Sequence, residues 1–121
     1  MDQFEVPGYL AEELPEIKED LKAWLPDLNL IKSIQCLTEY TRNMLVQNDL
    51  LLARKCFLLA EDIYAKGDPI VMDIVENVFV YSFSAMLNLC KREVEEPISG
   101  LVPLSLYTAY IRRSLKVGNR N

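Results

Sequence analysis

The amino-acid sequence predicts an all-α protein: a compact bundle of five to six antiparallel helices that forms one domain over residues 1–121. Apolar residues recur at helical spacing along the chain, and no segment of four or more residues alternates strictly between apolar and polar side chains. Half of the residues are hydrophobic and 26% are charged, which is ordinary for a globular domain.

The N-terminal quarter of the chain predicts two short helices. Pro7 suits the first turn of a helix over about residues 7–13, with Leu10 and Leu14 on its inward face. Pro15 disfavours helical geometry at the residue before it, so we expect a break there. A second helix is expected over about residues 15–25. Its apolar face consists of Leu14, Ile17, Leu21, Trp24 and Leu25.

Two longer helices are expected next. Asp27 or Asn29 can cap the third helix, which runs to about Gln47. Its main face consists of Leu30, Ile34, Leu37, Thr41, Met44 and Leu45. Asn48 and Asp49 then offer a turn and a cap for a fourth helix over about residues 50–66. Gly67 is expected to end that helix in the left-handed conformation.

A buried central helix is expected over about residues 69–92. Asp68 can cap it and Pro69 fits its first position. Apolar residues cover most of its circumference, which is typical of a buried helix. The last helix is expected over about residues 103–116, with Leu104, Tyr107, Tyr110, Ile111 and Leu115 on one face. The predicted core includes Leu21, Trp24, Leu37, Leu59, Ile63, Ile74, Val78, Phe79, Phe83, Ile111 and Leu115.

A narrow polar stripe runs along the predicted central helix, with Asp73, Asn77, Tyr81, Ser84 and Asn88 three or four residues apart. One interpretation is a strip that faces solvent or hydrogen-bonds to neighbouring helices. The other is a groove wall that receives a partner segment or a small ligand, because solvent-facing strips usually carry Lys and Glu. The candidate interaction surface is Asn77, Tyr81, Ser84, Asn88, Tyr107 and Tyr110.

The residue content argues against enzyme chemistry. The chain has no histidine, which removes Ser-His-Asp and Cys-His arrangements and histidine-ligated zinc. Cys36, Cys56 and Cys90 lack the close spacing of a zinc site and read as reduced core residues. The four glycines stand singly, so there is no phosphate-binding loop. We therefore expect no metal, no cofactor and no catalytic activity.

Charge is unevenly distributed along the chain. The net charge is −5, with −6 over residues 1–27 and +3 over residues 91–121. An acidic chain with a modest basic tail is a poor nucleic-acid binder. The acidic head and the basic tail can pair, within one chain or between two. The longest charge-free apolar run, residues 77–90, is too short to span a membrane. The first residues lack signal-peptide features, so a cytoplasmic location is expected.

Three functions are open. The first is a non-catalytic intracellular protein-interaction module, its simplest form a homodimer through the predicted central helix. The second is an immunity-type inhibitor whose acidic N-terminal surface, including Glu12, Glu13, Glu16 and Glu19, covers the basic active site of a toxin. The third is a binder of small apolar ligands in a slot between residues 69–92 and the last helix.

The segment NDLLLARKCFLLAEDIYAKGDPIVMDIVENVFVYSFSAM resembles a group of small, uncharacterised all-α bacterial proteins. Its pattern bridges two helices through a Gly-Asp turn. The matching positions are Leu59, Ala60, Tyr64, Gly67, Asp68, Val71, Ile74 and Phe79. The resemblance implies a helix–turn–helix packing arrangement and carries no assigned activity or catalytic residues.

Overall fold

The computed structural model describes residues 1–23, 29–82, 85–86 and 103–118, and these residues confirm the all-α prediction. The elements in chain order are α1 (Val6–Glu13), η1 (Pro15–Ile17), α2 (Lys18–Ala23), α3 (Leu30–Val46), α4 (Leu50–Lys66), α5 (Pro69–Ile74), η2 (Val75–Phe79), η3 (Val80–Ser82) and α7 (Leu104–Gly118). η1 and η3 are 3₁₀ turns, and η2 is a π-helical turn. Within the described ranges, no helix combines the length and the hydropathy needed to cross a bilayer.

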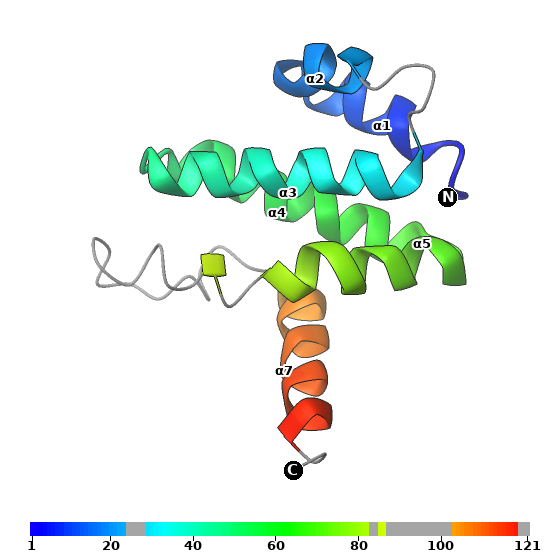
Figure 1. Ribbon diagram of the computed structural model, residues 1–121, viewed down its shortest axis with the longest axis vertical. Helices are drawn as coiled ribbons and strands as arrows, with labels where there is room; N and C mark the ends of the chain where they lie inside the picture. Colours follow the sequence, from blue (N-terminus) through cyan, green and yellow to red (C-terminus); the bar gives the residue numbers. More distant parts are fainter. Residues whose placement is uncertain (24–28, 83–84, 87–102, 119–121) are drawn as a thin grey trace.

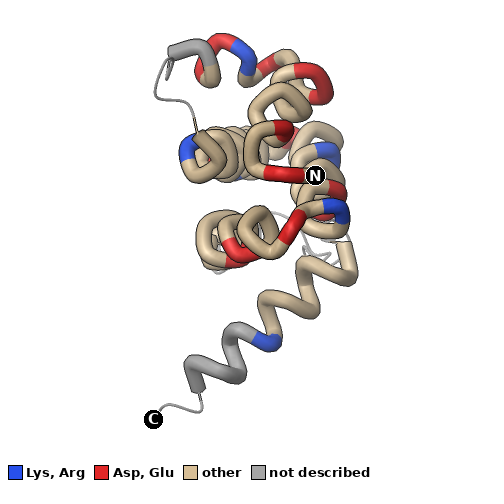
Figure 2. Tube along the Cα trace, turned by 90° about the vertical axis from the view of Figure 1, so that its right-hand side faces the viewer, with Lys and Arg blue, Asp and Glu red and all other residues tan. Residues whose placement is uncertain are grey.

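The helices stack in three layers along the long axis of the molecule (Figure 1). α3 and α4 lie side by side in the middle, α1 and α2 cover one side, and the segment from α5 to η3 covers the other. α7 begins beside the layer that runs from α5 to η3 and extends away from it, roughly perpendicular to α3 (Figure 1). The acidic helices α1 and α2 therefore lie at the opposite end of the molecule from α7, the helix that contains Arg112 (Figures 1 and 2). Pairing of acidic head and basic tail within one chain does not occur among these residues.

The predicted break before Pro15 is confirmed. Leu14 ends α1 with φ −132° and ψ 74°, outside the helical region that a following proline disfavours. A 3₁₀ turn then leads into α2. The apolar residues that flank the break, Leu10, Leu14, Ile17 and Leu21, are all buried. The break therefore folds α2 back while both short helices keep their apolar faces toward the core.

Side-chain caps begin α3, α4 and α5. The Lys32 N–H donates to Asn29 Oδ1 at 2.9 Å, Leu52 N–H to Asp49 Oδ1 at 3.2 Å, and Val71 N–H to Asp68 Oδ1 at 3.0 Å. Each bond satisfies a backbone donor that the first turn of a helix leaves without an intrahelical partner. The alternatives for α3 are thereby resolved in favour of Asn29, and the predicted caps at Asp49 and Asp68 are confirmed.

Asn48 closes α3 in the left-handed region, with φ 60°. The Asp49 N–H donates to the Met44 carbonyl at 2.8 Å, and the Asn48 N–H donates to the Leu45 carbonyl at 3.1 Å. This pair of bonds is the Schellman arrangement, which satisfies carbonyls at a helix end and turns the chain sharply. It sends α4 back along α3.

Gly67 ends α4 for a different reason from the one predicted. Its φ of −73° and ψ of 149° are extended, so the predicted left-handed conformation is wrong. A Cβ on this residue would lie 2.5 Å from Val71 Cγ1 and 2.7 Å from the Ile63 carbonyl oxygen. The turn thus requires glycine because there is no space for a side chain, and the chain can then pass directly from α4 to the Asp68 cap.

The core lies between the middle layer and the helices that cover it. Phe57 of α4 and Phe79 of η2 meet edge to face, with ring centroids 5.7 Å apart. Of the predicted core residues, Leu21, Leu37, Leu59, Ile63 and Phe79 are buried, whereas Ile74 and Val78 are half-buried against the core. The predicted core side chains of Trp24, Phe83 and Leu115 lie outside the described residues.

The middle of the fold is α3 and α4, and the expectation that residues 69–92 form the buried central helix is not confirmed. In the described part of that segment, Val71, Val75, Phe79 and Val80 are buried. Ile70 is 54% exposed and Tyr81 is 67% exposed. The segment therefore packs through one face. The π-helical turn places one extra residue in its turn, which brings both Phe79 and Val80 inward.

α7 docks through a different face from the one predicted. Leu106 and Ala109 are buried, whereas Leu104 is 80% exposed and Ile111 is 39% exposed, so the prediction that Ile111 belongs to the core is wrong. The small Ala109 side chain allows close approach. Two polar contacts fix the orientation: Arg112 pairs with Glu76 at 2.9 Å and the Ser105 hydroxyl donates to Glu61 at 2.9 Å.

Candidate functional site

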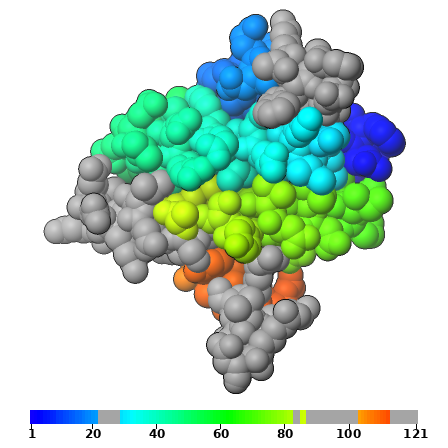
Figure 3. Space-filling model, viewed as in Figure 1, coloured from blue at the N-terminus to red at the C-terminus, as the bar shows by residue number. Residues whose placement is uncertain are grey.

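A groove of about 860 Å³ runs between α3 and the η2–η3 segment, and we call it the α3 groove. One wall is formed by Lys32, Gln35, Cys36, Thr38, Glu39, Tyr40 and Asn43 of α3, with Asp20 of α2 beside it. The other wall is formed by Asn77, Val78, Tyr81 and Ser82. In the space-filling view, α3 lies directly above the segment from α5 to η3 (Figure 3).

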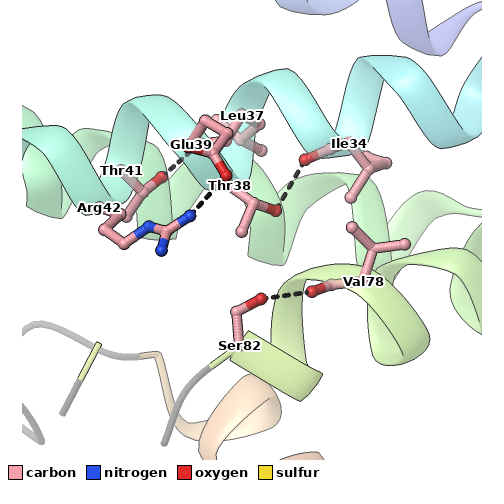
Figure 4. Close-up of polar contacts among 8 residues, drawn as sticks. All are labelled: Ile34, Leu37, Thr38, Glu39, Thr41, Arg42, Val78 and Ser82. Atoms are coloured by element: carbon pink, nitrogen blue, oxygen red, sulfur yellow. Dashed lines mark hydrogen bonds and ion pairs between the residues drawn. The ribbon is translucent and has the colours of Figure 1, made fainter. Parts of the chain in front are cut away.

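Polar side chains at the base of the groove are satisfied by their own helices. The buried Thr38 hydroxyl donates to the Ile34 carbonyl at 2.7 Å, and the Ser82 hydroxyl donates to the Val78 carbonyl at 2.9 Å. Figure 4 shows these two hydroxyl groups on facing sides of α3 and η3. Each hydroxyl donates to the carbonyl four residues earlier. Among the described residues, no buried side-chain nitrogen or oxygen atom lacks a hydrogen-bond partner.

The π-helical turn builds the second wall. It contains Asn77 and Val78, which line the groove, while the adjacent Val75 and Phe79 are buried in the core. π-helical turns are rare and occur frequently at functional sites. The 3₁₀ turn that follows carries Tyr81, which is 67% exposed on the rim.

The groove carries little net charge. Its ionisable carboxylates and ammonium groups are Asp20, Lys32 and Glu39, and the Glu39 carboxylate pairs with Arg42 at 2.5 Å. This pair is exposed, so it adds little to stability. Most other lining groups are carboxamides, hydroxyls and apolar surface. Such a lining suits an uncharged polar ligand better than a phosphate, a nucleic acid or a metal ion.

A second hollow of about 410 Å³ adjoins the same segment. It is lined by Arg42, Tyr81, Ser82, Ala85 and Met86. Tyr81 and Ser82 line both hollows, so the Tyr81 ring stands where a ligand of either would touch it.

The structure brings together part of the sequence-predicted surface. Asn77 and Tyr81 share one wall of the α3 groove. Tyr107 and Tyr110 are half-buried on α7, with ring centroids 6.2 Å apart, and they line neither hollow. Ser84 and Asn88 lie outside the described residues. In the described part of the chain, neither hollow therefore has a wall from α7, the helix beside which the ligand slot was predicted.

Sequence reasoning missed the α3 wall. Gln35, Glu39 and Asn43 lie four residues apart on the side of α3 opposite its apolar face, and all three are exposed. Two uncharged amides in a row are a weak signal, because exposed helix faces more often carry Lys and Glu. That signal was available in the sequence, but the neighbouring η2–η3 segment that makes it a groove was not.

One family model matches nearly the whole chain. The family described as Domain of unknown function (DUF7674) matches residues 7–116. The chain belongs to this family. The match confirms the prediction of a family without an assigned activity, and both walls of the α3 groove lie within the DUF7674 region. No curated protein and no solved structure matches the chain.

A polar cluster ties the first helix of this DUF7674 domain to α4, away from the groove. The Tyr9 hydroxyl donates to Asp62 Oδ2 at 2.5 Å, and Lys66 Nζ lies 3.1 Å from Asp62 Oδ1. The hydrogen bond from Tyr9, aided by Lys66, lowers the pKa of the Asp62 carboxyl. Burial and the same bond raise the pKa of Tyr9. This cluster is a link between helices.

The two described cysteines have different surroundings. Cys56 is buried, and burial raises the pKa of its thiol to about 11. Cys36 is partly exposed and lines the α3 groove. Neither of these two cysteines forms a disulfide. The Cys56 side chain therefore serves to pack the core, whereas the Cys36 thiol is open to reagents that enter the groove.

Proposed function

We propose that the protein is a non-catalytic protein-interaction module whose α3 groove receives a segment of a partner protein. The observation that carries the proposal is the groove itself, which places Asn77 and Tyr81 opposite a row of polar side chains on α3. Exposed tyrosine rings are frequent energetic anchors of protein interfaces. The low net charge of the groove and the lack of histidine in the chain favour binding over catalysis. Cys36 and Cys56 form no disulfide, which is compatible with a reducing, cytoplasmic setting.

Site-specific photo-crosslinking tests this proposal. A photoreactive benzoylphenylalanine at position 81 replaces one exposed aromatic side chain with another. Position 51 is the control, because Leu51 is 85% exposed on α4 and lines neither hollow. In cells that express the chain naturally, position 81 should give a discrete protein adduct that position 51 does not give. An adduct of two copies of this chain would identify a homodimer.

Binding measured with the purified partner completes the test. Tyr81→Ala should weaken binding by about 30-fold, which corresponds to an interface hot spot of about 2 kcal/mol. Leu51→Ala should leave the dissociation constant unchanged. Identical adducts from positions 81 and 51, or none from either, would contradict the proposal.

A second candidate is inhibition of a basic partner by the acidic end of the molecule. Glu12, Glu13, Glu16, Glu19 and Asp20 are all exposed on or beside α1 and α2 (Figure 2). Concentrated surface charge of one sign speeds association with a partner of the opposite sign and makes it salt-sensitive. This arrangement suits an immunity-type protein, with the toxin encoded by a neighbouring gene.

Charge reversal separates this candidate from the first. Changing the four glutamates to lysine should slow association with the neighbouring gene product at least tenfold at low salt, and the difference should shrink at high salt. Tyr81→Ala removes none of these four carboxylates, so it should leave that association unchanged. If charge reversal has no effect on association, the inhibitor hypothesis is wrong.

A further inference from the structure

We propose that the α3 groove binds its partner as an extended polypeptide, held largely through the peptide main chain by carboxamide side chains of α3. This inference rests on the proposed function and adds the conformation of the bound segment. Gln35 and Asn43 are the two carboxamides on the α3 wall, and both are exposed. A carboxamide offers a carbonyl acceptor and an N–H donor side by side. It can therefore bond to the N–H and the C=O of a single peptide residue at once.

The spacing of these side chains matches the repeat of an extended chain. Gln35, Glu39 and Asn43 are separated by four residues each, which is about 6.0 Å of helix rise per step. In an extended chain, every second residue directs its N–H and C=O toward the same edge, at intervals of about 6.6 Å. Two steps give about 12 Å on the helix and about 13 Å on the peptide. The long Gln35 side chain can absorb a mismatch of about 1 Å.

The length of the wall sets the length of the bound segment. From Lys32 to Asn43 the wall covers eleven residue intervals of α3, or about 16 Å. An extended chain advances about 3.3 Å per residue, so about five residues fit along it.

The rest of the groove suits the side chains of an extended segment. Residues that alternate between the two faces of such a segment would point in turn toward the groove floor and toward solvent. Half-buried Val78 and Cys36 offer apolar contact there, and the Tyr81 ring stands on the rim. Main-chain bonds would then provide affinity, and one or two inward side chains would provide selectivity.

A helical partner fits these observations less well. The backbone N–H and C=O groups within a helix are already paired, so the α3 carboxamides would have no main-chain groups to bind. Helix-binding grooves also rely on a broad apolar floor that accepts anchors three and four residues apart. Among the described residues that line the α3 groove, only Val78 and Cys36 could serve as small apolar contacts.

Selection from a library of random twelve-residue peptides displayed on phage provides a probe that requires no knowledge of the natural partner. The full-length protein is the bait, and enriched peptides are synthesised for binding measurements. Gln35→Ala combined with Asn43→Ala should raise their dissociation constants at least tenfold. Gln47→Ala is the matched control, because Gln47 is an exposed amide at the end of the same helix and lines neither hollow. The Gln47→Ala variant should bind the same peptides with the dissociation constants of the unmodified protein.

Ester substitution in the peptide tests main-chain recognition directly. Replacing one amide N–H at a time with an ester oxygen removes a single donor and keeps the side chains. The affinity should fall at every second position and remain within threefold at the positions between. A helical or side-chain-only binding mode would not produce this alternation.

The possible outcomes separate this inference from the proposed function. Failure to enrich any peptide, insensitivity to the paired alanine substitutions, a helical bound peptide, or uniform ester effects would each overturn extended main-chain recognition. If position 81 nevertheless crosslinks to a protein partner, the interaction module stands and only the bound conformation is wrong. If position 81 gives no specific adduct, the proposed function fails as well.

Discussion

Replacing Gly67 with alanine should destabilise the protein, although the backbone conformation there suits alanine. With φ −73° and ψ 149°, Gly67 lies where alanine is unstrained. At such positions alanine normally raises stability by about 0.4–1 kcal/mol, because it restricts the unfolded chain. The surroundings of Gly67 reverse this sign.

The magnitude follows from the close approach of the added Cβ to two residues, Val71 and Ile63. The added Cβ would lie 2.5 Å from Val71 Cγ1 and 2.7 Å from the Ile63 carbonyl oxygen, against an optimum of about 3.5–4.0 Å between carbon atoms. Val71 is fully buried and the Ile63 oxygen belongs to the α4 backbone, so neither can move freely. Overpacking of this kind typically destabilises by about 1–3 kcal/mol. After the unfolded-state gain is subtracted, a net loss of about 1–2 kcal/mol is expected.

Urea unfolding followed by far-ultraviolet circular dichroism measures this loss, and the thermal midpoint should fall by about 3–8 °C. Val71→Ala provides the second arm, because it removes Cγ1, the nearest of the obstructing atoms, while Val71 Cβ at 2.8 Å and the Ile63 oxygen remain. In that background Gly67→Ala should be less destabilising by about 1 kcal/mol or more, which a double-mutant cycle detects. A Gly67→Ala variant that is more stable than the parent would refute the reasoning. Equal effects in both backgrounds would show that Val71 is not the obstacle.

Three further predictions concern local chemistry. Asn48 has φ 60°, so Asn48→Gly should raise the free energy of unfolding by up to about 1 kcal/mol and Asn48→Ala should lower it by about 1 kcal/mol. Urea unfolding measures both, and an alanine variant more stable than the glycine variant would contradict this prediction. The hydrogen bond from Tyr9 lowers the pKa of the Asp62 carboxyl in the folded protein below its unfolded value of 3.8. The ionised carboxylate therefore stabilises the fold above pH 3.8, and this stability is lost as the pH falls through the folded pKa. Tyr9→Phe should therefore raise the Asp62 midpoint in an NMR titration and reduce the loss of stability in acid, and an unchanged midpoint would contradict the contact. With its thiol pKa raised to about 11, buried Cys56 should resist iodoacetamide at about pH 8 until the chain unfolds, whereas Cys36 should react in the folded protein. Peptide mass mapping distinguishes the two cysteines, and labelling of Cys56 before unfolding would be inconsistent with its burial.

The starts of α3, α4 and α5 and the break before Pro15 were predictable because their causes are local. Asn29, Asp49 and Asp68 each accept a hydrogen bond from a backbone N–H three residues later, so a short window of sequence contains both partners. Pro15 acts on the residue directly before it. The apolar face of α3 also follows from spacing alone, and every residue predicted on it is buried.

The features that the sequence did not predict depend on neighbours in space. Gly67 was expected to adopt a left-handed conformation, but its role is to leave room for Val71 and Ile63. Likewise, a regular helical wheel cannot anticipate the extra residue in the π-helical turn, which sets the register of Asn77 and Tyr81. For the candidate site, one wall was partly predictable from its polar stripe. The facing row on α3 became a wall only through the packing of η2 and η3.

The α3–α4 hairpin also determines the order in which the fold can assemble. Only Gln47, Asn48 and Asp49 separate the two long helices, so their contacts close a very small loop, at little entropic cost. By contrast, the Ser105–Glu61 and Arg112–Glu76 contacts of α7 bridge 44 and 36 residues. Local contacts form fastest, so α7 should dock last and detach first. Hydrogen exchange should then show the α7 amides opening at lower free energy than those of α3 and α4, and equal protection would mean that α7 belongs to the same cooperative unit as the hairpin.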